Sequence, residues 1–229
     1  MNLGDAKLPE HFSGIVRLFP LPNLVLFPGV VQALHIFEPR YRKMMNDLMA
    51  SDQLVTMCLY REPEDQMKPG VIPEVHATVC IAKVIAHKEL DDGRFNLLVM
   101  GVKRAKIIRE LPVDQPYRMA EVSIIEDELP EDDAERENLL AALVEKCQSL
   151  ELHQKLAHQL DLDKVLTAQL GVGLLVDLIG FSADLDCSQR QSVLELAKVE
   201  ERLALLISIL TNQSDAGQKQ TFPPDFSNN

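Results

Sequence analysis

The sequence of 229 residues contains no tryptophan, and aromatic residues make up only 5% of it. Long hydrophobic runs are also missing. The two longest apolar stretches, residues 172–181 and 203–210, are shorter than the roughly 18 residues that a membrane helix needs. Residues 1–10 include Asp5 and Glu10 and have no apolar core, unlike a secretory signal. We therefore expect no association with a membrane and a cytoplasmic location.

Cysteine and histidine are sparse, with four and six residues, respectively. No two cysteines have the C-x₂-C spacing of a zinc or redox motif, and each lies among apolar neighbours, which favours reduced thiols in the core. The histidines show no H-E-x-x-H pattern, and His153 and His158 are five positions apart, so they do not share a helix face. We predict no metal site and no cofactor.

The motifs of the common catalytic machineries are absent as well. No G-x-x-x-x-G-K-[ST] loop is present to hold nucleotide phosphates, and no G-x-S-x-G elbow occurs. Ser182 has no recognisable base nearby in sequence, and a turn explains the acidic pair Asp91-Asp92. We predict no catalytic residues, although a serine–lysine pair formed only in three dimensions stays open as an alternative.

Charge is distributed unevenly along the chain. Residues 1–125 hold 15 Lys/Arg and 15 Asp/Glu, whereas residues 126–229 hold 8 and 20 and so carry all of the net charge of −12. The hydrophobic period changes at the same place, which predicts two structural units, 1–125 and 126–212, and then a mobile polar tail, 213–229. A clustered positive surface for nucleic acid is lacking, so we expect a protein or peptide partner instead.

The first unit has the pattern of β-structure. Short apolar runs separated by Gly and Pro predict about six strands in a small barrel or sandwich, and Asp92-Gly93 predicts a hairpin. Pro39 at a first helical position predicts one helix over residues 39–50, whose methionine-rich stripe favours core packing over an adaptable binding surface. The predicted strand segments are 14–19, 25–27, 30–37, 54–60, 77–88, 94–101, 102–110 and 118–125.

The second unit has helical periodicity. An amphipathic helix is expected to start near Asp133, further helices to follow through residues 156–170, and a short apolar helix to lie buried at residues 171–180. Ser188 and Gln191 have the spacing of a capping box. A last helix then carries apolar residues from Val193 to Leu210 on one side. Several consecutive amphipathic helices are typical of a bundle.

Ordered motifs occur in both units, at residues 19–29, 34–42, 92–104, 175–179, Gln191 and 201–203. These motifs resemble the N-terminal domain of Lon proteases. The resemblance implies an α+β fold, with a PUA-like β-barrel of about six strands and one inserted helix followed by an α-helical bundle. In Lon proteases this region helps to capture unfolded or tagged polypeptides for the attached ATPase and peptidase. Ala33 and Ala105 depart from the family pattern, and either could alter a surface that lines a groove.

Two sets of residues are candidates for binding a peptide. Phe27, Phe37 and Tyr41 could border an apolar groove for an extended chain, although packing of Tyr41 beneath the barrel is the favoured interpretation. Arg94 and Arg104 flank the predicted hairpin and could hold a carboxylate, although ion pairing with neighbouring acids is the favoured interpretation of both.

The leading functional hypothesis is a non-catalytic recognition module that binds exposed hydrophobic or unfolded polypeptide segments, or a protein partner, in connection with proteolysis. The alternative is a component of an ATP-dependent serine peptidase that acts with a separate motor chain. A third hypothesis is RNA binding, by analogy with other PUA-like barrels, and the neutral first unit and acidic second unit oppose it.

Overall fold

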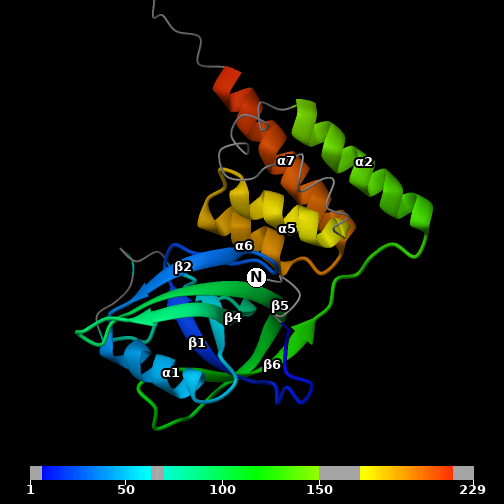
Figure 1. Cartoon of the computed structure of the whole chain (residues 1–229). Helices are drawn as coiled ribbons and strands as arrows, with labels where there is room; N and C mark the ends of the chain where they lie inside the picture. Colours follow the sequence, from blue (N-terminus) through cyan, green and yellow to red (C-terminus); the bar gives the residue numbers. More distant parts are fainter. Residues whose placement is uncertain (1–6, 63–65, 67–69, 150–170, 219–229) are drawn as a thin grey trace, which may run out of the picture.

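The computed structural model describes residues 7–62, 66, 70–149 and 171–218, in which six strands are followed by a group of helices (Figure 1). One helix, α1, lies between β2 and β3, and the others follow β6. The strands are β1 (Ile15–Leu21), β2 (Val31–Ile36), β3 (Leu54–Leu59), β4 (Thr78–Glu89), β5 (Phe95–Leu111) and β6 (Met119–Ile125). The described helices are α1 (Pro39–Met49), α2 (Asp133–Ser149), α5 (Val172–Ser182), α6 (Cys187–Glu195) and α7 (Val199–Gln218).

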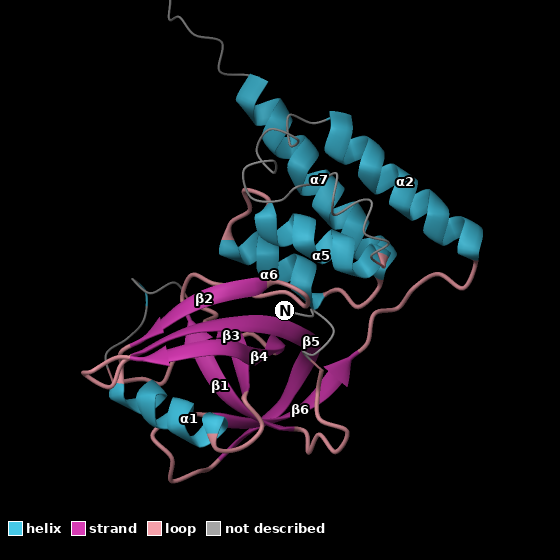
Figure 2. Cartoon of the chain, viewed as in Figure 1, coloured by secondary structure: helices cyan, strands magenta, loops and turns pink. Residues whose placement is uncertain are grey.

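The strands form one mixed sheet in the order β2-β5-β4-β3-β1-β6, and β5 pairs with β6 in addition. Only the β1–β3 pair is parallel. Strand β5, which is 17 residues long, pairs with β2, β4 and β6, and the sheet is strongly curved (Figure 2). These features confirm the predicted α+β class, with six strands and one inserted helix. The PUA-like barrel and the bundle are finer descriptions that stay predictions.

The predicted and the observed strands differ at Gly101. The sequence places a boundary at this residue, but β5 continues through it from Phe95 to Leu111. The predicted strand at residues 25–27 is also wrong, because these residues form no strand and the bridge to Gly101 is made by the following residue, Pro28. A Cβ atom on Gly101 would lie 2.1 Å from the carbonyl oxygen of Phe27. Glycine therefore serves here to let a second backbone cross the strand.

The main core lies between the inner face of the sheet and α1. The stripe of Tyr41, Met44, Met45 and Leu48 is buried, as predicted for core packing. The Tyr41 ring meets Phe19 edge to face, with ring centroids 4.5 Å apart. Helix α1 therefore covers this side of the sheet, and a ligand would have to approach the sheet from another side.

Helices α6 and α5 lie next to the sheet on the side away from α1, and α7 and α2 lie beyond them (Figure 1). Helix α5 is buried as predicted, and α2 begins at Asp133 as predicted. The part of the chain that the structure describes has no helix long and apolar enough to cross a membrane. The helices predicted within residues 156–170 lie outside the described residues.

Two predictions for the last helices are wrong. The predicted final helix is two helices, because residues 196–198 leave the helical conformation and Lys198 bridges to Glu128. The capping box is formed by Asp186 and Gln189, and not by Ser188 and Gln191. Helix α7 also extends to Gln218, beyond residue 213, where the tail was expected to start. Residues 219–229 lie outside the described part.

Candidate functional site: an outer groove on strands β2, β5 and β4

The three aromatic residues predicted to border a groove do not share a surface. Phe27 and Tyr41 are 0% and 4% exposed and belong to the main core, whereas Phe37 is 61% exposed. Phe27 is drawn inward by the same loop that crosses Gly101, and Tyr41 points from α1 into the sheet. Of the three, only Phe37 is available to a ligand.

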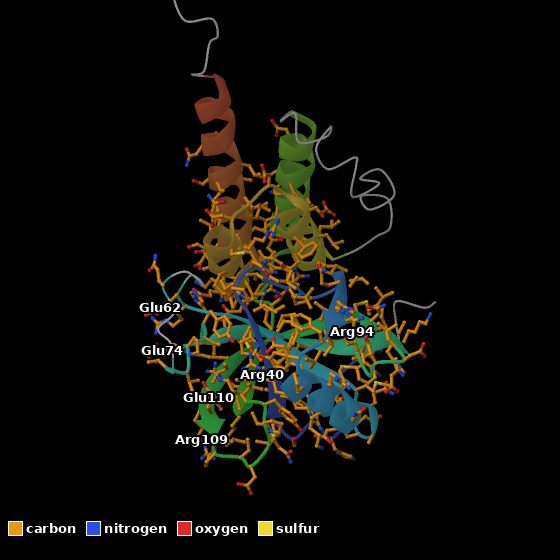
Figure 3. All side chains as sticks on the ribbon, turned by 90° about the vertical axis from the view of Figure 1, so that its left-hand side faces the viewer. Arg40, Glu62, Glu74, Arg94, Arg109 and Glu110 are labelled. Atoms are coloured by element: carbon orange, nitrogen blue, oxygen red, sulfur yellow. The ribbon has the colours of Figure 1, made fainter. Side chains whose placement is uncertain are left out.

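The two predicted arginines also lie apart. Arg94 stands at the exposed β4–β5 hairpin (Figure 3), where its Nε donates to Asp92 Oδ2 at 2.6 Å. Arg104 lies further along β5, is 2% exposed and donates to Asp127, Asp177 and the carbonyl oxygen of Leu194. They cannot hold one carboxylate together. Each has an acidic partner within the chain instead.

Arg104 belongs to an ion cluster in which Arg104, Asp177 and Arg202 are buried and Asp127 is partly exposed. Arg202 donates to both carboxylate oxygens of Asp127, at 3.0 and 2.9 Å, and its Nε lies 3.3 Å from Asp177 Oδ1. Burial raises the pKa of Asp177 to about 6, although both arginines oppose that shift. Burial also opposes ionisation of Asp127, but hydrogen bonds and charge from Arg202, together with Arg104, lower its pKa.

The ion cluster connects the sheet to the helices. Arg104 comes from β5, Asp177 from α5 and Arg202 from α7. A Cβ atom on Gly173 would lie 2.3 Å from Asp127 Oδ2, so the small residue at the start of α5 makes room for this carboxylate. The four charged groups pair with one another, and we therefore interpret the cluster as structural.

An open groove of about 450 Å³ lies on the outer face of β2, β5 and β4. Leu98 on β5 pairs with Ala33 on β2 and with Ala86 on β4, so these three side chains form one apolar row across the strands. The small alanines on both sides of Leu98, which is 38% exposed, leave the hollow. The groove is lined by Ala33, Leu34, His35, Ala86, His87, Lys88, Asn96, Leu97 and Leu98.

A polar row lies beside the apolar row. Asn96 on β5 pairs with His35 on β2 and with Lys88 on β4. His35 Nδ1 lies 2.7 Å from Asn96 Oδ1, and His35 Nε2 lies 3.4 Å from Nη1 of Arg94. The exposed Phe37 stacks on His35 with ring centroids 6.2 Å apart. Sequence reasoning missed this groove, although the alternation of Ala33, His35 and Phe37 along one strand could have indicated an outward face.

Of the two departures from the family pattern, only one reaches this surface. Ala33 is exposed and lines the groove. Ala105 is fully buried in a smaller core cluster on the opposite half of the sheet, so it cannot line a groove.

Nothing in the described residues resembles a catalytic or metal centre. They contain no group of three or more metal-ligating side chains. Within the same ranges, no hydroxyl or thiol is hydrogen-bonded to a histidine or lysine. Burial raises the pKa of the Cys58 and Cys80 thiols to about 12, which makes both poor nucleophiles at neutral pH.

A family model for the ATP-dependent protease La (LON) substrate-binding domain matches residues 15–212 of the chain. The chain belongs to the LON substrate-binding domain family. It is 26% identical to a Lon protease of Anaeromyxobacter dehalogenans. The aligned stretch of 208 residues is 90% of this chain and 24% of that protein. A Lon protease 2 of Herpetosiphon aurantiacus is 29% identical over 219 residues, which are 92% of this chain and 26% of that protein. The chain thus spans about a quarter of the length of these curated relatives.

Solved structures of Lon N-terminal domains share the fold. The N-terminal domain of the Mycobacterium avium complex Lon protease superposes with a TM-score of 0.66 at 18% identity, covering 86% of this chain and 98% of that one. The Lon N-terminal domain protein from Xanthomonas campestris superposes with a TM-score of 0.60 at 22% identity, covering 85% of this chain and 97% of that one. Three of the LON-type motifs supply Arg104, Asp177 and Arg202 to the ion cluster. In this chain, the motifs that carry the resemblance therefore include residues that hold the fold together.

Proposed function

We propose that this chain is a non-catalytic recognition module that binds exposed hydrophobic segments of unfolded polypeptides, or docks on a protein partner, and thereby serves proteolysis by other chains. Membership of a substrate-binding family supports the binding of polypeptide. We further propose that the curved sheet is a PUA-like barrel that presents the binding surface, and that the helices form a bundle that supports it.

The observation that carries the proposal is the open apolar groove on the outer sheet face. Its row of Ala33, Leu98 and Ala86 is solvent-accessible, whereas the chain's other large apolar side chains on this sheet mostly face the core. A hollow of about 450 Å³ is within the size range of ligand pockets, roughly 300–1,000 Å³. An exposed hollow that contains a row of apolar side chains is a typical contact surface for a protein segment.

The test compares the anisotropy of a fluorescent, permanently unfolded polypeptide with that of its folded form as the protein is titrated. We expect binding of the unfolded form only. Leu98→Glu should weaken it at least tenfold, or about 1.4 kcal/mol, because a charge then occupies the apolar row. Ile108→Glu is the matched control, since Ile108 is also an exposed apolar residue on β5 and lies outside the groove.

Two results would contradict the proposal. One is that the wild-type protein binds neither form at micromolar concentration. The other is that Leu98→Glu and Ile108→Glu weaken binding equally while circular dichroism shows both variants folded, because the groove would then have no special part in the interaction.

A further inference from the structure

We propose that the groove selects an extended segment that carries an apolar side chain and, two residues away, a carboxylate. This inference rests on the proposed function and names the class of polypeptide that the groove prefers. It follows from the hydrogen-bond directions in the polar row, from the spacing of the two rows and from the charges around them.

The polar row is a set of hydrogen-bond donors. A guanidinium can only donate, so Nε2 of His35 must accept from Arg94, and the proton of the neutral ring is then on Nδ1. His35 Nδ1 therefore donates to Asn96 Oδ1 across 2.7 Å. Arg94 is itself held by Asp92. The contacts that run from Asp92 to Asn96 engage the amide oxygen of Asn96, a residue that lines the groove, and leave its NH₂ group as the donor for a ligand.

A cation stands beside that amide group. Lys88 pairs with Asn96 across the β4–β5 ladder, and its ammonium group has no ion-pair or hydrogen-bond partner among the residues that the structure describes. The Asn96 amide group likewise donates to no described residue. One free cation next to two free N–H donors is suited to an anion, and a carboxylate accepts from both kinds of donor.

The charges of the lining agree with this assignment. Residues 1–125, the unit that contains the groove, carry 15 Lys/Arg and 15 Asp/Glu and thus no net charge. None of the nine residues that line the groove is acidic, and one of them, Lys88, is a cation. The charge of the lining therefore favours a carboxylate over an amine or a neutral polar group as the companion of the apolar side chain.

The spacing of the rows matches that of an extended chain. Leu98 and Asn96 are two residues apart on β5, so the apolar and polar rows are separated by about 6.7 Å. Side chains at i and i+2 of an extended peptide point to the same side with the same separation. A segment lying along the strands can thus place an apolar side chain over Leu98 and a carboxylate over Asn96 and Lys88 at once.

The experiment uses fluorescent heptapeptides with blocked ends in a Gly/Ser background. Both orders of leucine and aspartate at i and i+2 are tested, beside the i,i+1 spacing and the leucine–asparagine version. We expect one i,i+2 order to bind at least tenfold more tightly than the i,i+1 and asparagine peptides. Asn96→Asp, which keeps the acceptor for His35 and removes the donors, should abolish that preference, and Lys88→Gln should reduce it.

Lys83→Gln is the matched control, because Lys83 is another β4 lysine without an ion pair among the described residues and lies outside the groove. If unfolded polypeptide binds but the peptides show no preference for the carboxylate, the inference fails and the proposed function stands. If a peptide with a free C-terminal leucine binds better than either internal order, the groove takes a chain terminus and the inference is overturned. If unfolded polypeptide does not bind either, the proposed function itself fails.

Discussion

At the scale of single residues, Gly101 has the most demanding position in the sheet. Its amide donates to the carbonyl oxygen of Val30 at 2.9 Å, and its own carbonyl oxygen accepts from Gly29 at 2.8 Å. The loop after β1 therefore continues the ladder directly over Gly101 and carries Phe27 into the core. The close approach depends on the missing side chain and not on an unusual backbone angle, because Gly101 has no positive φ.

We predict that Gly101→Ala destabilises the protein by about 2–4 kcal/mol, because an added methyl group overlaps backbone atoms that cannot rotate away. The free energy of unfolding from urea titration measures the effect. Gly171→Ala serves as the control, since no atom lies within 4 Å of a Cβ at that residue, and it should cost at most about 1 kcal/mol. Equal costs for the two variants would show that the crossing at Gly101 is not tight.

At the scale of single elements, helix α6 could begin at either of two capping-box patterns in the sequence. Gln189 N–H donates to Asp186 Oδ1 at 2.8 Å, and Gln189 Oε1 accepts from Asp186 N at 3.0 Å. Ser188 instead lies inside the first turn of the helix, where its side chain has no capping role. Two overlapping capping-box patterns occur in the sequence, and the helix uses the one that begins at Asp186.

Asp186→Ala is expected to lower stability by about 1 kcal/mol, because the N–H of Gln189 loses its acceptor. Ser188→Ala should change stability by less than about 0.5 kcal/mol. Thermal unfolding of the two variants side by side measures both effects. A larger loss for Ser188→Ala than for Asp186→Ala would contradict the observed cap.

At the scale of the whole molecule, the ion cluster fixes how the sheet meets the helices, and its two carboxylates respond oppositely to pH. The pKa of Asp177 is raised to about 6, so its stabilising contribution is present below its ordinary value of 3.8 and is lost as pH rises through about 6. The pKa of Asp127 is lowered, so its contribution is present above 3.8 and is lost as pH falls through the folded-state pKa.

We predict that Asp177→Asn and Asp127→Asn change the pH dependence of stability in opposite directions. The stability of the wild type relative to Asp177→Asn should fall as pH rises from about 4 to 6, and relative to Asp127→Asn it should rise as pH increases up to about 4. Urea unfolding across this range measures both slopes. Slopes of the same sign would mean that the two aspartates share one environment.

Much of the fold follows from local pattern. Alternating apolar residues, the Asp92-Gly93 turn and Pro39 predicted the strands, the hairpin and α1, because burial of one face imposes its period on the sequence. The break at residues 196–198 did not follow. The apolar period runs unbroken from Val193 to Leu210, and the helix is interrupted by pairing of Lys198 with Glu128, a residue far away in the chain.

The sequence by itself determined the family, the α+β class and the absence of the common catalytic motifs, because these depend on residue order and composition. Only the tertiary structure decided which side chains are available. Phe27, Tyr41 and Arg104 are polar or aromatic candidates in sequence, yet contacts with distant segments bury all three. Conversely, Ala33, Ala86 and Leu98 carry no chemical signal individually. They form a groove because strand register places them in one row, and register is set by the packing of the whole sheet.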